Sequence, residues 1–221
     1  MKVYIEAGSK KVFVCALDYP GWARAARTEE DALEAFVRYG PRYQAATKGA
    51  ATLKLPRSAS ALDAVERVPG DATTDFGAPS KQITSDKDPL TNRELKNQIA
   101  ILRKSWDAFD AAAKRHRRAT LRKGPRGGGR DLDKIVEHVL GAEIGYFNRL
   151  GGRFKAEASE AVPKQMARVR DEVIALLDER ASGHEPPMGR RTAPLWSLRY
   201  FIRRSAWHAL DHAWEIEDKR L

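Results

Sequence analysis

The residues of this sequence whose types and spacing are best suited to chemistry are histidines. His208 and His212 lie four residues apart in a stretch, 194–221, whose pattern predicts one long helix. Side chains at positions i and i+4 stand one above the other on a helix, so both imidazoles can reach a single metal ion. The pair is half of a metal site, and a further ligand must come from another element.

The best candidate for a third ligand is His138, because His116 falls in a basic run and His184 in a loop. A helix expected over 132–150 places His138 at the edge of its apolar stripe, among small residues. The pair on the last helix flanks an apolar stripe in the same way. Each helix therefore puts its histidines where a pocket between helices would open.

Three imidazoles would leave at least one coordination position for water or substrate, which is the mark of a catalytic metal site. Nitrogen ligands of this kind suit Zn, Ni or Fe(II), and the spacing does not choose among these divalent metals. Such a metal lowers the pKa of a bound water toward neutrality or holds a thiolate for transfer. The alternative interpretation is three partly buried histidines that are satisfied by hydrogen bonds.

Glu143 is the candidate catalytic residue, because it falls near the middle of the apolar stripe of helix 132–150, where an unpaired carboxylate is costly. It is either salt-bridged among the helices or a hydrogen-bond partner or proton acceptor near the metal. Glu215 stands one turn from His212. The loop 127–130 either offers amides and Arg130 to an anion at a helix N-terminus or is a flexible exposed loop.

The net charge of +10 raises nucleic acid as a partner. Residues 1–92 carry 13 Lys and Arg against 12 Asp and Glu, a net charge of +1, so residues 93–221 carry the remaining +9. Eight of these basic residues lie in 114–130, which contains no acidic residue. This segment predicts either contacts to an anionic ligand or a solvated helix end and loop.

The N-terminal part, 1–69, has the pattern of a small α/β module. Two short apolar runs around a Gly-Ser-Lys turn predict a hairpin, Thr28 followed by acids predicts a capped helix, and the stretch ending at Pro69 predicts a strand. The expected order is β-β-α-β. Cys15, the only cysteine, is expected to be a small buried thiol.

Residues 70–92 have no apolar period and several Gly and Pro residues, so we expect a surface linker that Phe76 pins. Beyond it the pattern changes to four amphipathic helices, expected from Thr91 to between 118 and 121, and over 132–150, 160–181 and 194–221, with Pro194 in the first turn of the last. Four such helices predict a four-helix bundle over 93–221 and an α+β fold class for the chain.

Trp196, Trp207 and Trp214 fall on a different side of the last helix from its histidines. A second apolar face of this kind needs a partner. We expect this face to pack against the N-terminal module or against a second subunit in a homodimer. The alternative, a base-stacking surface, would require aromatic residues among exposed basic residues.

Two parts of the chain resemble known families. VFVCALDYPGWARAARTEEDALEAFVRYGPRY, residues 12–43, looks like the small HicB-type fold, with its strand, aspartate-x-Pro-Gly turn and Thr/Glu-capped helix, which implies a fold and no catalysis. KIVEHVLGAEIGYFNRL and SAWHALDHAWEIE resemble helices of the DinB-like superfamily, which are four-helix bundles with a three-histidine metal site. This second resemblance covers 93–221 and implies His138, His208 and His212 as ligands.

DinB-like proteins include S-transferases and isomerases that use small bacterial thiols, and some hydrolases. The resemblance implies a metal-dependent enzyme that acts on a small molecule, by hydrolysis or with a low-molecular-weight thiol. The competing hypotheses are a nucleic-acid-binding or regulatory module and a bundle that keeps a metal only for stability. No apolar run is long enough for a membrane span and no secretory signal is apparent, so we expect a cytoplasmic protein.

Overall fold

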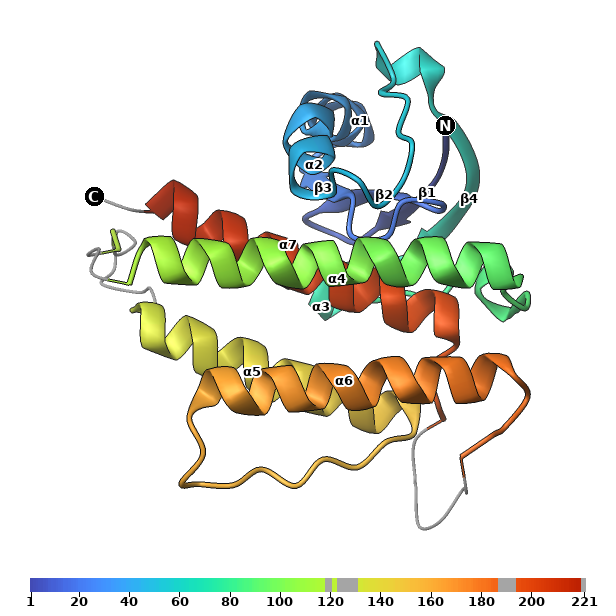
Figure 1. The fold of residues 1–221 in the computed structure, drawn as a ribbon. Helices are drawn as coiled ribbons and strands as arrows, with labels where there is room; N and C mark the ends of the chain where they lie inside the picture. The colour runs from blue at the N-terminus through green and yellow to red at the C-terminus, as the bar shows by residue number, and fades with distance from the viewer. Residues whose placement is uncertain (118–120, 123–130, 187–193, 220–221) are drawn as a thin grey trace. The chain divides into compact units, whose positions relative to one another are not determined.

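The computed structural model describes residues 1–117, 121–122, 131–186 and 194–219 of an α+β protein (Figure 1). The chain forms two compact units, one of Met1–Ser105 with Ile202–Trp207 and one of Trp106–Phe201 with His208–Leu221. The units therefore divide inside two helices and not in the segment 70–92, where we expected a linker. Among the described residues, no helix combines the length and the apolar content that a membrane span requires.

The first unit contains a mixed sheet of four strands in the order β3-β2-β1-β4. Their bounds are β1 (Lys2–Ala7), β2 (Val12–Ala16), β3 (Ala23–Ala26) and β4 (Asp63–Pro69). β1 and β2 form the expected antiparallel hairpin, and β4 lies parallel to β1. The expected β-β-α-β order was incomplete because β3, with the sequence ARAA, has no β-branched or aromatic residue and is held by its pairing with β2.

Trp22 fixes the two helices that follow the sheet's third strand, α1 (Glu29–Arg38) and α2 (Gly40–Ala46). Its indole stacks on Phe36 of α1 at 4.4 Å between ring centroids and on Tyr43 of α2 at 5.1 Å. The indole Nε1 donates a hydrogen bond to the backbone oxygen of Phe36 at 3.0 Å. Because all three rings are buried, this stack forms the centre of the helical layer.

The segment 70–92 is ordered, contrary to the expected irregular linker. After η1 (Ala59–Ala61) and β4 it forms α3 (Ala72–Phe76) and a 3-10 turn, η2 (Thr84–Lys87). The buried carboxylate of Glu6 on β1 accepts hydrogen bonds from the backbone N–H groups of Ser80 and Lys81 and from the hydroxyl of Thr74. Phe76 is 87% exposed, so the expectation that it pins the segment is wrong. Polar contacts to Glu6 anchor the segment instead.

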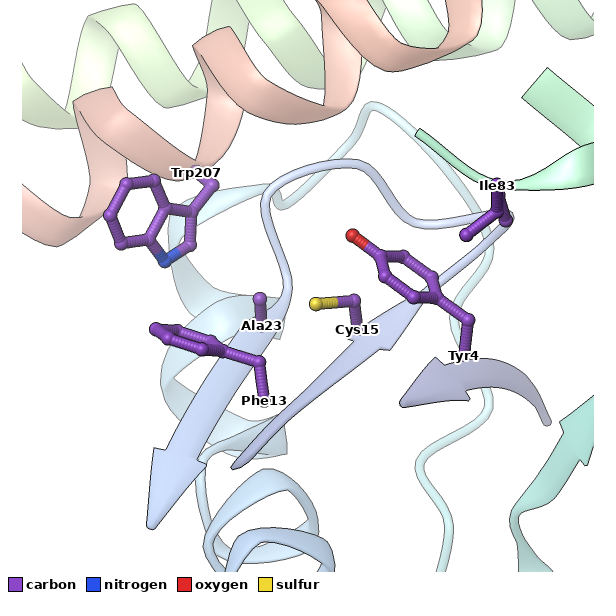
Figure 2. Packing of buried hydrophobic residues seen from close by; sticks show 6 residues of the cluster. All are labelled: Tyr4, Phe13, Cys15, Ala23, Ile83 and Trp207. Carbon is purple, nitrogen blue, oxygen red and sulfur yellow. The ribbon is translucent and has the colours of Figure 1, made fainter. Parts of the chain in front are cut away.

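The face of the sheet shown in Figure 2 packs against Trp207. Tyr4, Phe13 and Cys15 extend from the strands on the face of the sheet on which Trp207 lies. The rings of Phe13 and Trp207 meet edge to face with 6.2 Å between their centroids. The side chain of Cys15 is buried, as expected. The prediction that tryptophans of the last helix pack against the N-terminal module is therefore confirmed for Trp207.

Four longer helices follow, α4 (Asn92–Arg115), α5 (Leu132–Leu150), α6 (Val162–Ala181) and α7 (Leu198–Lys219). α5 and α6 pack against each other. α5 has the expected bounds, whereas α4 ends before the expected range, α6 begins two residues late, and Pro194 lies outside α7, which begins at Leu198. The four-helix bundle as a whole stays a prediction.

Candidate metal centre

The sequence of α5 determines where the helix begins and ends, and therefore where His138 lies. The side chain of Asp131 accepts a hydrogen bond from the backbone N–H of Lys134 at 3.0 Å and caps the first turn. Gly151 ends the helix with φ of 117°, a conformation that side chains with a Cβ rarely adopt. Between these signals, buried apolar residues set the rotation of α5 and leave His138 half-buried at the edge of the apolar stripe.

The structure brings the three predicted histidines together within the second unit. His138 on α5 and His208 and His212 on α7 each offer one ring nitrogen, and these nitrogens all lie within 4.8 Å of one another. The Nε2 atoms of His138 and His208 are 3.3 Å apart. The ring centroids of the three side chains are 4.5 to 5.2 Å apart.

This spacing fits a metal ion. Two nitrogens that are each about 2.05 Å from a tetrahedral zinc ion lie roughly 3.3 Å apart, which is the separation of the His138 and His208 Nε2 atoms. Three neutral imidazoles are also a ligand set that zinc, nickel and iron accept. His208 is buried, so few water molecules compete with a metal for its ring. The described donors therefore fit the group that the sequence predicted.

Glu215 adds a carboxylate to this cluster, although it offers no ligand atom to the group of three. Its Oε2 lies 2.7 Å from Nδ1 of His212, and its Oε1 accepts a hydrogen bond from the Lys219 ammonium at 2.6 Å. These contacts, the one with His212 first, lower the pKa of Glu215 to about 2. In the sequence, Glu215 lies one turn from His212. The i, i+3 spacing of the two residues could have predicted their contact, which we did not infer from the sequence.

Aromatic rings border the cluster on the side of His208. The ring of Tyr146 meets the His208 ring edge to face at 5.5 Å, and Tyr146 in turn packs against Trp196 at 5.1 Å. Trp196 precedes α7 and its backbone N–H donates to the carbonyl of Arg149, so the prediction that it belongs to a tryptophan face of the last helix is wrong. Trp214 is on that helix and is buried.

Glu143 lies elsewhere, in an ion pair. Its carboxylate accepts hydrogen bonds from Nε and Nη2 of Arg170 on α6 at 3.0 and 2.9 Å, and Nη1 of Arg170 donates to Asp110 on α4 at 2.8 Å. Burial raises the pKa of Glu143 to about 7, against the effect of Arg170 and helped by the negative charge of Asp110. The structure thus has the salt bridge that was one of the two expected alternatives, and a catalytic role for Glu143 stays a prediction.

The other candidate residues are not in the cluster. His116 is buried just beyond α4, and His184 is exposed after α6. Of the basic segment 114–130, residues 118–120 and 123–130, including the Gly127–Arg130 loop, lie outside the described residues. A cavity of about 700 Å³ is lined by residues that include Phe109 and Met166, and none of the three clustered histidines lines it.

Comparison with models of known families, with curated proteins and with solved structures gives no match to this chain. The three-histidine cluster is therefore interpreted from its own geometry.

Proposed function

We propose that this protein binds one divalent metal ion through His138, His208 and His212, and that it uses the metal as a DinB-like enzyme acting on a small molecule. The observation that carries the proposal is the separation of 3.3 Å between two imidazole Nε2 atoms, with the third imidazole beside them. Zinc, nickel and iron(II) are the candidates, because their preference for nitrogen ligands fits this donor set.

The three ligands that the described residues offer support catalysis over a purely structural metal. Structural zinc sites use four protein ligands, whereas catalytic sites use three and leave a position for water or substrate. The metal would supply Lewis acidity at that position, to a water in hydrolysis or to a low-molecular-weight thiol in S-transfer. Together with the expected DinB-like four-helix bundle, this favours hydrolase or thiol transferase chemistry.

The protein's own side chains keep the three rings in position. His208 is buried and is flanked by Tyr146, so its ring has little room to turn. His212 is held by Glu215 at 2.7 Å. Both histidines are on one helix, so their relative position is set before a metal arrives, which lowers the entropic cost of binding.

Metal analysis of protein purified without a chelator tests the proposal. We expect about one divalent ion per chain, as a single three-ligand site requires. His208→Ala should lose the metal, and His184→Ala, which removes an exposed histidine outside the cluster, should keep it. Metal at 100 times its Kd should stabilise the wild-type chain by about 2.7 kcal/mol against thermal unfolding. Wild-type protein without metal affinity would refute the proposal.

A second experiment separates an enzyme from a bundle that keeps a metal for stability. Cobalt(II) reports its coordination by its visible spectrum, so the cobalt-loaded protein is titrated with a small thiol. A spectral change that His184→Ala retains and His208→Ala loses supports an open position. An unchanged spectrum together with a metal-dependent rise in Tm indicates a structural metal.

Nucleic-acid binding is the competing function. It is favoured by the net charge of +10 and by the segment 114–130. Within the described residues of this segment, Arg115 pairs with Glu217 at 3.6 Å and the Arg122 side chain donates to the carbonyl of Asp218. These contacts occupy two of the basic residues in the segment. The described part of the segment therefore supports nucleic-acid binding less than the histidine cluster supports metal binding. Binding to DNA or RNA that weakens steeply with salt would favour it.

A further inference from the structure

The contact between His212 and Glu215 indicates which ring nitrogen of His212 is available to bind a metal. An imidazole has two ring nitrogens, and in its neutral form one carries the proton and the other carries the free lone pair. Oε2 of Glu215 lies 2.7 Å from Nδ1 of His212. A carboxylate oxygen without a proton accepts hydrogen bonds, so this contact favours a neutral His212 ring with its proton on Nδ1. Nε2 is then the nitrogen with the lone pair.

A second contact holds the carboxylate in place. Lys219 donates to Oε1 of Glu215 at 2.6 Å, while His212 uses Oε2. His212, Glu215 and Lys219 are spaced i, i+3 and i+7 along α7, so one helical face carries all three. The contact with the ammonium holds the carboxylate in place and restricts its rotation. Glu215 is about one-fifth exposed, so solvent screens these contacts only in part.

We propose that Glu215 is a positioning residue that fixes the Nδ1–H tautomer of His212 and makes its Nε2 the third metal ligand. This inference rests on the proposed metal binding. In metal sites, a carboxylate often accepts a hydrogen bond from the ring nitrogen of a histidine that does not bind the metal. This contact makes the other nitrogen a more basic metal ligand and fixes the orientation of the ring. Glu215 is not itself a member of the three-residue ligand group, so its effect reaches the metal only through His212.

The inference predicts a graded series of metal affinities. Loss of a carboxylate behind a ligating histidine typically weakens metal binding by about 10- to 100-fold. We expect a loss of this size for Glu215→Ala, and a smaller loss for Glu215→Gln, since a glutamine oxygen still accepts from Nδ1 but has no charge. Glu217→Ala is the matched control, because Glu217 is on the same helix and pairs with Arg115. The control should bind metal as the wild type does.

Two measurements on the full chain test this. Competition between the protein and a chromophoric chelator for zinc gives the affinity of each variant. Long-range ¹H–¹⁵N correlation spectra of the metal-free, ¹⁵N-histidine-labelled protein identify the tautomer of His212. A merely structural ion pair between Glu215 and Lys219 would not change the tautomer, so this readout is specific to the proposed role.

The outcomes are distinguishable. Nδ1–H in the wild type, with weaker zinc binding in the order Gln then Ala, supports the inference. If the wild type binds zinc and Glu215→Ala binds it equally well, or if His212 carries its proton on Nε2, the inference fails and the metal site stands. If the wild type binds no zinc, the proposed function fails and this inference fails with it. Should Glu215→Ala not fold, the Gln variant and the tautomer of the wild type still decide.

Discussion

The ion pair between Asp86 and Arg203 should be one of the strongest single contacts in the first unit. Both side chains are buried, and two hydrogen bonds of 2.6 and 2.7 Å join them. Asp86 also accepts from the backbone N–H of Ile83 at 2.8 Å, so Asp86→Ala leaves a buried guanidinium and a buried amide without this acceptor. Removing one partner of a buried pair costs about 3 to 5 kcal/mol, and we expect a loss of unfolding free energy in this range.

Urea unfolding followed by circular dichroism and tryptophan fluorescence measures this loss, with the slope on urea concentration checked for constancy. Glu29→Ala is the control, since the exposed pair of Glu29 and Arg67 at 2.8 Å should contribute only about 0 to 1 kcal/mol. The double variant Asp86→Ala with Arg203→Met should recover much of the stability, because no buried charge is left alone. If Asp86→Ala costs no more than Glu29→Ala, or if the double variant is as unstable as the single one, the reasoning is refuted.

Two further predictions concern groups with shifted pKa values. Burial raises the pKa of Glu143 to about 7 from 4.5, so its contribution to stability is full below pH 4.5 and is lost as pH rises through 7. The stability of the wild type relative to Glu143→Gln should therefore fall over this interval in urea titrations, and a constant or rising difference would contradict the assignment. Burial also raises the pKa of Cys15 to about 12. Ellman's reagent should then label Cys15 rapidly in urea and no faster than the chain unfolds in buffer, and fast labelling of the folded chain would show that the thiol is accessible.

The parts of the fold that could be predicted are those with local signals. α5 begins after the Asp131 cap and ends at Gly151, where backbone chemistry restricts the choice of residue. α1 begins after Thr28, whose hydroxyl accepts from the backbone N–H of Asp31 at 3.1 Å. Each of these boundaries depends on residues within four positions of one another, so the sequence alone determines it.

The parts that could not be predicted depend on partners distant in the sequence. β3 exists because its backbone pairs with β2, and its own residues have little preference for a strand. The segment 70–92 is ordered by the carboxylate of Glu6, which is 74 residues from Ser80. Its polar composition suggested a linker, since the residues that form such hydrogen bonds are also the residues of exposed loops.

The candidate site shows the same division. Spacing along one helix was enough to pair His208 with His212, and the position of His138 on the edge of an apolar stripe was enough to propose it as the third ligand. The partner of Glu143 could not be chosen from the sequence, because Arg170 is 27 residues away and several other cations lie on the same helices. A buried carboxylate predicts that a cation faces it, and only the packing of α5 against α6 says which one.

α7 contributes residues both to the core of the first unit and to the histidine cluster of the second. Trp207 belongs to the core of the first unit, where it packs on Phe13, and the next residue, His208, belongs to the three-histidine cluster of the second. Neighbouring residues on a helix point about 100° apart, so a single helix can supply both without either side chain entering the other's surroundings. Arg203, one turn earlier, is held by Asp86. The ion pair and the tryptophan therefore fix the rotation of this part of α7 within the first unit.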